Sequence, residues 1–158
     1  MEQASIENKV AELLLKKGLT LAIAESCTGG LLGHRLTNVT GSSGFFMGGV
    51  TAYSYSAKET VLKLERRALE TYTSVSKEIA LEMALAVKML FASDCALAIT
   101  GIAGPGGEKP GKPVGLTFIG LVTPTASHWQ KHIWQGNRES NKQQSVTAAL
   151  AFLEAVIK

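Results

Sequence analysis

The sequence predicts a single α/β domain in which helices cover both faces of a mixed, mainly parallel β-sheet. Three observations predict it. Segments with apolar residues at helical spacing alternate along the chain with short apolar runs typical of buried strands. Apolar residues make up 46% of the chain and charged residues 18%, the composition of an ordered globular protein. The length of 158 residues suits one domain without repeats or linkers, so we expect one three-layer α/β/α unit over residues 1–158.

The first half of the chain predicts two helices and two strands before a third, short helix. Ile6, Val10 and Leu14 fall on one helical face, and Gly18 follows as a typical residue after a helix end. Turn-forming residues around Gly41 separate the second helix from the second strand. The expected elements in order are a helix over 5–17, a strand over 19–24, a helix ending near 36, a strand over 45–54 and a short helix from 56.

The second half of the chain predicts a long helix, three strands and a final helix. Ser76 is a typical N-cap, and Ile79, Met83 and Val87 then share one helical face. A late hairpin of two longer strands makes the predicted sheet mixed. The expected elements after the long helix are a buried strand over 95–100, strands over 114–122 and 128–134, and a last helix capped by Asn137 or Ser140.

The charge pattern favours a small-molecule ligand. The net charge is +3, from 16 lysines and arginines against 13 aspartates and glutamates, and the basic residues are not clustered. An anionic small molecule fits this pattern, whereas a nucleic-acid partner needs a basic stripe, so we expect none. The chain has no apolar run long enough to span a membrane, and its N-terminus is too polar for a secretory signal. We therefore expect a cytoplasmic protein without a membrane partner, and the sequence leaves a homo-oligomer open.

Several catalytic chemistries are excluded by residues that the chain lacks. Asp94 is the single aspartate, so a Ser-His-Asp triad has to use it or a glutamate, and an aspartate-rich Mg²⁺ site cannot form. The cysteines and histidines are too few and too scattered for a zinc site or a disulfide framework: Cys27, Cys95, His34, His128 and His132. We therefore expect neither a metal nor another cofactor.

A polar turn, Glu25-Ser26-Cys27-Thr28-Gly29-Gly30, follows the first predicted strand and precedes a helix. Free amides at the start of a helix attract anions, and the hydroxyls of Ser26 and Thr28 could add further donors. An N-cap with a tight turn explains the same pattern, so both interpretations stay open. Ser26 is not in a G-x-S-x-G nucleophile elbow, because Ala24 and Thr28 occupy the two glycine positions.

A glycine-rich stretch over residues 101–115 imitates nucleotide-binding motifs without meeting their requirements. It contains G-x-x-x-x-G-K, which ends at Lys112. A P-loop needs a serine or threonine after the lysine and a helix behind it, whereas Pro113 and a predicted strand follow here. The spacing after Gly101 is also wrong for a dinucleotide fingerprint. We therefore predict no binding of ATP with Mg²⁺.

Serines and a lysine flank the second predicted strand. Ser42 and Ser43 precede it, and Tyr53 and Lys58 follow it. Serine hydrolases that lack a His-Asp pair can use a lysine base when burial keeps its amine neutral. The plainer alternative is a solvated helix lysine with turn-forming serines. Cys27 has no neighbouring histidine to serve as its base, so we expect a small buried thiol there.

Four motifs, in this order along nearly the whole chain, resemble the CinA C-terminal domain family. They are residues 24–30 (AESCTGG), 41–43 with 49–58, 75–78 (VSKE), and 100–107 (TGIAGPGG) leading to 112–115. The family includes nicotinamide-nucleotide amidases, which hydrolyse the carboxamide of nicotinamide mononucleotide to nicotinic acid mononucleotide and ammonia. The resemblance implies this activity and an α/β/α fold. Longer relatives carry a preceding molybdopterin-binding-like domain, so it also implies a stand-alone amidase.

The resemblance also implies roles for individual residues. Ser43 becomes the nucleophile, and Lys58, fifteen positions later, becomes its base. Arg138 matches a family arginine and is expected to meet the substrate phosphate through its guanidinium. The other residues expected to line the pocket are Ser26, Thr28, Gly29, Tyr53, Thr100 and Gly101.

The chain departs from the family pattern at two places. Tyr55 and Ser56 replace the usual Asn-Glu pair, and Lys142 replaces a second arginine. These departures bear on substrate affinity more than on the chemistry, because the expected Ser-Lys pair is intact. The alternative function is a catalytically silent member of the family, which binds a nucleotide or a partner without turnover.

Overall fold

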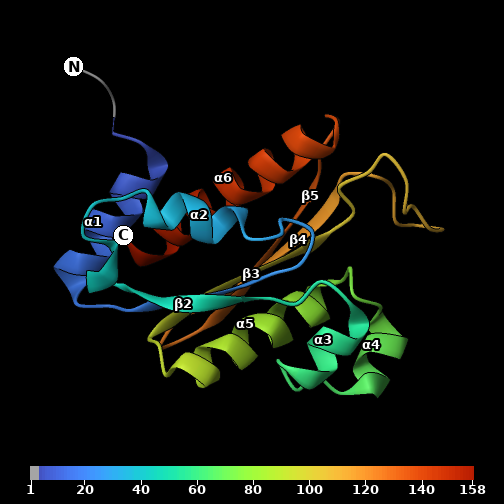
Figure 1. Ribbon diagram of the computed structural model, residues 1–158, viewed down its shortest axis with the longest axis horizontal. Coiled ribbons are helices and arrows are strands. Elements are labelled where there is room, and N and C mark those ends of the chain that lie inside the picture. The colour runs from blue at the N-terminus through green and yellow to red at the C-terminus, as the bar shows by residue number, and fades with distance from the viewer. Residues whose placement is uncertain (1–3) are drawn as a thin grey trace.

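The computed structural model describes residues 4–158, which form a five-stranded sheet between two layers of helices. Figure 1 shows α1, α2 and α6 on one face of the sheet and α3, α4 and α5 on the other. The predicted three-layer architecture is therefore confirmed. The helices are α1 (Ile6–Lys17), α2 (Leu31–Thr37), α3 (Tyr55–Thr60), α4 (Arg66–Tyr72), α5 (Lys77–Phe91) and α6 (Arg138–Ile157), with a short 3-10 helix η1 (Ser42–Gly44).

The sheet has the strand order β2-β1-β3-β4-β5. The strands are β1 (Leu21–Glu25), β2 (Phe46–Thr51), β3 (Cys95–Gly101), β4 (Leu116–Val122) and β5 (Ser127–Ile133). β1 pairs in parallel with β2 and β3, whereas β3-β4 and β4-β5 pair antiparallel. The sheet is mixed as predicted, but its two parallel pairs equal its two antiparallel pairs, because β4 and β5 follow β3 without crossover helices.

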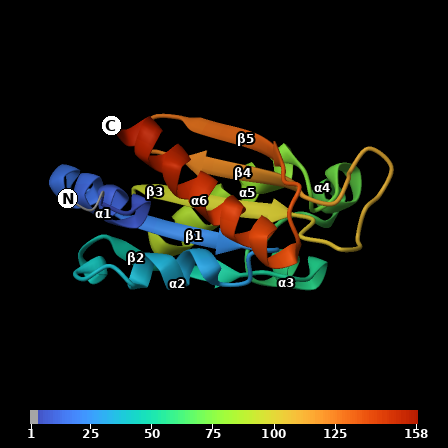
Figure 2. The ribbon, with the colours of Figure 1, turned by 90° about the horizontal axis from the view of Figure 1, so that it is seen from above.

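The strand directions bring five chain segments to one edge of the sheet. The carboxyl ends of β1, β2, β3 and β5 meet there, together with the start of β4. Figure 2 shows the long loop between β3 and β4 extending past this edge, where α6 also begins. Crevices at the carboxyl ends of parallel strands are the usual ligand sites of open α/β sheets. This edge is therefore the place to look for a functional site.

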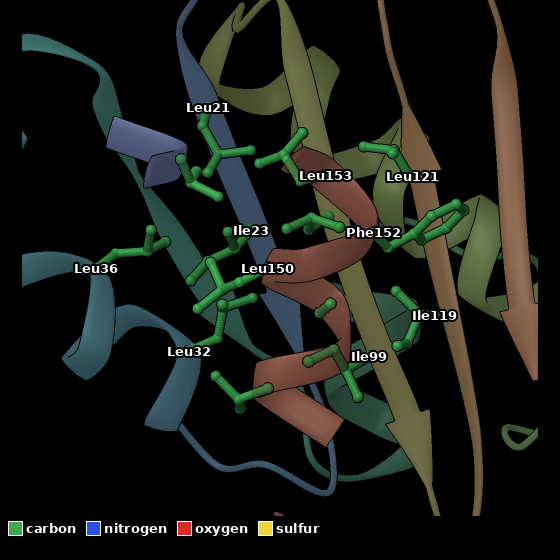
Figure 3. Packing of buried hydrophobic residues seen from close by; sticks show 14 of the residues in the cluster. Leu21, Ile23, Leu32, Leu36, Ile99, Ile119, Leu121, Leu150, Phe152 and Leu153 are labelled. Atoms are coloured by element: carbon green, nitrogen blue, oxygen red, sulfur yellow. The ribbon is translucent and has the colours of Figure 1, made fainter. Parts of the chain in front are cut away.

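The larger hydrophobic core lies between the sheet and the layer of α1, α2 and α6. Figure 3 shows Leu150, Phe152 and Leu153 of α6 facing side chains of the strands and of α2. The strand and α2 residues labelled in this core are Leu21, Ile23, Ile99, Ile119, Leu121, Leu32 and Leu36. From Val146 to its end, α6 thereby buries apolar surface over the sheet, which fixes the helix so that its first residues lie at the carboxyl edge.

The second core lies under α5 and depends on small strand residues. Ala22 and Ala24 of β1 face it, together with Ala96 and Ala98 of β3. Gly120 of β4 lets the helix approach further, since a Cβ on this residue would lie 2.5 Å from the carbonyl oxygen of Ala80. The close approach fixes α5, and with it the segment before α5 that reaches the carboxyl edge.

Most predicted element starts are confirmed by side-chain caps. Ser5 caps α1, Ser76 caps α5 and Asn137 caps α6, each accepting a hydrogen bond from a backbone amide three residues on. α3 begins one residue before the predicted position because Ser54 caps it. The helix α4 was not predicted. Among residues 4–158, no helix is both long enough and apolar enough to cross a membrane.

Candidate active site

A cavity of about 240 Å³ opens at the carboxyl edge of the sheet. Its wall combines the turn after β1, the segment after β2, the segment before α5, the loop after β3 and the start of α6. The lining residues are Ser26, Cys27, Tyr53, Ser74, Gly101, Ile102, Ala103, Gly104, Gly106, Gly107 and Arg138. Four of the residues predicted for the pocket, Ser26, Tyr53, Gly101 and Arg138, are therefore brought together.

Lys58 lies behind this cavity with its amine against Ser26. The side chain extends from α3 and is 1% exposed. Its Nζ is 3.0 Å from Ser26 Oγ, 2.9 Å from the carbonyl oxygen of Ala52 and 3.2 Å from that of Tyr53. Burial desolvates the ammonium and lowers the pKa of Lys58 below that of an ordinary lysine. The predicted alternative of a solvated helix lysine is therefore wrong.

The three partners of Lys58 are also compatible with a neutral amine, the form that can act as a base. A neutral amine has two N–H donors and one lone pair. The carbonyl oxygens of Ala52 and Tyr53 can accept the two N–H groups, which directs the lone pair toward the hydroxyl of Ser26. Ser26 itself is held in place, because its amide donates to Ile99 and its carbonyl oxygen accepts from Gly29. This arrangement can remove a proton from Ser26 with little movement.

The structure does not bring Ser43 to Lys58. Ser43 lies in η1, before β2, whereas Lys58 follows β2 at the opposite edge of the sheet. The strand between them has six residues and spans roughly 20 Å. The predicted Ser43-Lys58 pair therefore needs correcting, since the hydroxyl in contact with Lys58 is that of Ser26.

Glu25 fills the anion site that the sequence suggested at the start of α2. Its buried carboxylate accepts hydrogen bonds from Thr28 Oγ1 at 2.7 Å, from the Leu32 amide at 2.8 Å and from the Gly33 amide at 3.2 Å. A carboxylate is favourable there because the helix N-terminus is positive. The capping interpretation of the turn is thus the one that the structure supports, with Glu25 as the cap.

Replacing Glu25 with alanine should destabilise the fold strongly. The Leu32 and Gly33 amides and the Thr28 hydroxyl would lose their acceptor inside the protein, at a cost of about 3 kcal/mol in the free energy of unfolding. Urea denaturation measures this loss. Glu12→Ala, on the exposed face of α1, is the matched control and should change stability by less than about 0.5 kcal/mol. Equal losses for both variants would contradict the capping role.

Three of the residues predicted to line the pocket lie outside the cavity wall. The hydroxyl of Thr28 is bonded to Glu25, and that of Thr100 donates to the carbonyl oxygen of Ser74 at 2.7 Å. Both threonines are buried and support the residues around the site. Gly29 faces Lys142, whose Nζ would lie 3.9 Å from a Cβ at this position. The three residues therefore do not line this cavity, and their contact with a ligand stays a prediction.

Arg138 lies between the first cavity and a second one beside it. Its guanidinium donates to the carbonyl oxygen of Gly104 at 2.7 Å and to the hydroxyl of Tyr53 at 2.9 Å. The second cavity, about 360 Å³, is lined by Leu31, Arg138, Glu139, Lys142 and Gln143. Neither Arg138 nor Lys142 forms a salt bridge within the described part of the chain. Both cations are therefore available to an anionic group placed between the two cavities.

The structure argues against Cys27 as a nucleophile and against Asp94 as a member of a catalytic triad at the cavity. Burial raises the pKa of the Cys27 thiol to about 12, so the thiolate is not available near neutral pH. The carboxylate of Asp94 accepts hydrogen bonds from the amide and hydroxyl of Thr20. Thr20 directly precedes β1 and Asp94 directly precedes β3, so both lie at the edge of the sheet opposite the cavity. Over residues 4–158, no three side chains of histidine, cysteine, aspartate or glutamate come together in a metal-binding group.

The sequence analysis missed Ser74 as a wall residue of the cavity. Ser74 lies between α4 and α5, and side chains of distant segments, Tyr55 and Thr100, hold it at the site. Five residues of the loop 102–107 also line the cavity, next to the predicted Gly101. No local pattern marks Ser74, since its position depends on residues from three other segments.

Comparisons with known proteins agree with this fold. The profile of the CinA C-terminal domain family matches residues 3–157. A competence-damage inducible protein of Caldanaerobacter subterraneus is 45% identical over 149 residues, and one of Moorella thermoacetica is 43% identical over 149 residues. Both matches cover 94% of this chain but 36% of the relative, so the chain spans little more than a third of their length.

Solved structures show the same architecture. A CinA superfamily protein from Klebsiella pneumoniae matches with a TM-score of 0.93 and 32% identity, over 96% of this chain and 95% of its own. A competence/damage inducible protein from Agrobacterium tumefaciens matches with a TM-score of 0.92 and 31% identity, over 100% of this chain and 99% of its own. With a family profile along almost its entire length and these close structural neighbours, the chain belongs to the CinA C-terminal domain family.

Proposed function

We propose that this chain is an amidohydrolase that converts nicotinamide mononucleotide to nicotinic acid mononucleotide and ammonia. The observation that carries the proposal is the buried amine of Lys58, 3.0 Å from the hydroxyl of Ser26 in the wall of a cavity. Such a pair can activate a serine without histidine or metal. The carboxamide substrate comes from the family resemblance of the motifs around this pair.

In the proposed reaction, Ser26 is the nucleophile and Lys58 the general base. The Ser26 oxygen attacks the carboxamide carbon while the Lys58 amine takes the hydroxyl proton. The tetrahedral intermediate places negative charge on the carboxamide oxygen, for which the amide of Cys27 in the cavity wall is the nearest candidate donor in sequence. Lys58 then protonates the departing ammonia, and water, activated by the same amine, releases the acid from Ser26.

The two cavities provide a physical reason for a mononucleotide substrate. The carboxamide has to reach Ser26 in the first cavity, and Arg138 borders both cavities. A phosphate between Arg138 and Lys142 would gain two charge-assisted partners. Tyr53 lies after the end of β2 and is 60% exposed. Its ring can offer an aromatic face to the positive pyridinium ring.

Incubating the protein with nicotinamide mononucleotide and measuring released ammonia tests the proposal directly. An amidase releases one ammonia per nicotinic acid mononucleotide, and both products can be quantified. Binding of the mononucleotide without ammonia would instead support the catalytically silent alternative. Chelation followed by dialysis should leave the turnover intact, because the proposed steps use only Ser26, Lys58 and the amide of Cys27.

Arg138→Ala should weaken binding of the mononucleotide about ten- to a hundred-fold, the factor for losing one charge-assisted contact. Its dephosphorylated riboside should lose much less affinity, because it carries no group for the guanidinium. Titration calorimetry with both ligands measures the difference. Arg67→Ala removes the same charge from exposed α4 and serves as the control. Equal losses for nucleotide and riboside would show that Arg138 does not meet the phosphate.

A further inference from the structure

The segment 72–75, called the strap here, is held by four side chains, three from distant segments and one from the residue that follows it. The Ser74 amide donates to Tyr55 Oη at 3.2 Å, and the Ser74 carbonyl oxygen accepts from Thr100 Oγ1 at 2.7 Å. The Thr73 carbonyl oxygen accepts from Ser76 Oγ at 2.9 Å. The fourth side chain is that of Lys112. The backbone of Ser74 is thus satisfied on both sides, which leaves its side chain to the cavity that it lines.

Lys112 makes the most extensive of these contacts. Its Nζ donates to the carbonyl oxygen of Tyr72 at 3.1 Å, to that of Val75 at 2.6 Å and to the hydroxyl of Thr73. An ammonium group has three N–H donors, and the strap supplies three acceptors for them. This explains why the G-x-x-x-x-G-K sequence is not a P-loop: its lysine is used inside the protein and has no donor left for a phosphate.

The backbone of the strap is strained at Thr73. This residue has φ 61° and ψ 165°, a region that residues other than glycine rarely occupy and that is costly for a β-branched side chain. A strained conformation persists only where its surroundings impose it. Because Lys112 contacts the residues on both sides of Thr73 and Thr73 itself, it is the contact best placed to impose this conformation.

We propose that Lys112 is a positioning residue that holds Ser74 in the cavity wall, and that Ser74 contacts the substrate away from the reacting carboxamide. The proposal rests on the proposed function for the identity of the substrate. Without Lys112 the strap relaxes at Thr73 and Ser74 leaves the wall. Within the described part of the chain, no hydrogen bond joins Ser26 or Lys58 to the strap, so we expect binding to suffer more than the chemical step.

Lys112→Met keeps the length of the side chain and removes its donors. We expect the KM and the Kd for nicotinamide mononucleotide to rise about ten-fold or more, with kcat changed by less than about three-fold. Ser74→Ala should raise the KM in the same direction. Lys109→Met, an exposed lysine three residues earlier in the same loop, is the matched control and should leave both constants unchanged.

Chemical rescue separates a positioning role from a general loss of folding. Lys112→Cys followed by bromoethylamine rebuilds a lysine-like amine at this position. The native cysteines should not react, because burial raises the pKa of Cys27 to about 12 and that of Cys95 to about 11. We expect the unmodified variant to show the raised KM and faster hydrogen exchange at the Ser74 amide, and aminoethylation to restore both.

Two results would overturn the proposal. One is a KM and Kd unchanged in Lys112→Met, and the other is a fall in kcat that aminoethylation of Lys112→Cys does not reverse. If the wild-type protein releases no ammonia, the proposed function fails, and the proposal about Lys112 is then judged by the Kd and by exchange at Ser74. If wild-type turnover is present but Lys112→Met binds the mononucleotide normally, only the positioning role is wrong.

Discussion

Ser26→Ala should abolish ammonia release, with a loss of about 10⁴-fold or more in kcat, because it removes the hydroxyl that Lys58 contacts. Ser43→Ala should leave the rate within about two-fold, since Ser43 lies before β2 at the other edge of the sheet. Steady-state release of ammonia from nicotinamide mononucleotide, measured for both variants, gives the comparison. Serine is replaced by alanine in each variant, so the two differ only in the position that is substituted.

The double variant Ser26→Ala/Lys58→Met extends this test. Residues that act as one unit lose their function together, so the double variant should be no slower than either single variant. Multiplied losses in the double variant would show that Ser26 and Lys58 act independently. If Ser43→Ala is inactive while Ser26→Ala is active, the nucleophile is Ser43, as the family resemblance implied.

Lys58→Met should lower kcat by a comparable factor, about 10⁴-fold, because the base for both half-reactions is lost. In the proposed reaction the active form is the neutral amine, so kcat/KM of the wild type should rise with pH and level off above the pKa of Lys58. Desolvation lowers that pKa below the ordinary lysine value, which moves the rise toward neutral pH. A rate profile from pH 5 to 10 checks this, and the residual activity of Lys58→Met should lack the rise.

The same shift has a consequence for stability that can be measured without substrate. Because the pKa of Lys58 is lower in the folded chain than in the unfolded chain, the unfolded chain holds more protons between the two values. Stability from this group therefore increases as pH rises through that window, up to the unfolded pKa. Lys58→Met should lose this slope, and Lys131→Met, an exposed residue of β5, should keep it. In the activity measurement, a kcat/KM that falls as pH rises through the same window would contradict the neutral base.

The helices that sequence predicts well are those with a wide apolar face and a clear cap. α5 buries Ile79, Met83 and Val87 and starts at Ser76, and both signals are visible in the sequence. α4 buries only Leu69 and has no side-chain cap, so nothing in its local pattern separates it from a loop. The share of parallel strands was overestimated because hydrophobicity marks a buried strand without giving its direction.

The predicted Ser43-Lys58 pair is wrong because finding the partner of Lys58 requires knowing which strands are neighbours in the sheet. Ser26 follows β1 and Lys58 follows β2, and both were noted as candidate residues. They meet because β1 and β2 are parallel neighbours, so their carboxyl ends adjoin. Ser43 is nearer to Lys58 in sequence, but a whole strand separates them. Lys112 and Ser74 were out of reach for the same reason, since their proximity depends on packing between distant segments.

The carboxylate at the start of α2 removes one of the usual phosphate sites of an α/β protein from this edge of the sheet. In many α/β proteins, the first amides of such a helix bind a phosphate. Here the Glu25 carboxylate already accepts from the amides of Leu32 and Gly33, so these amides are not free to bind a phosphate. We therefore expect the phosphate of a nucleotide to depend on side-chain cations such as Arg138 and Lys142, and not on the first amides of a helix.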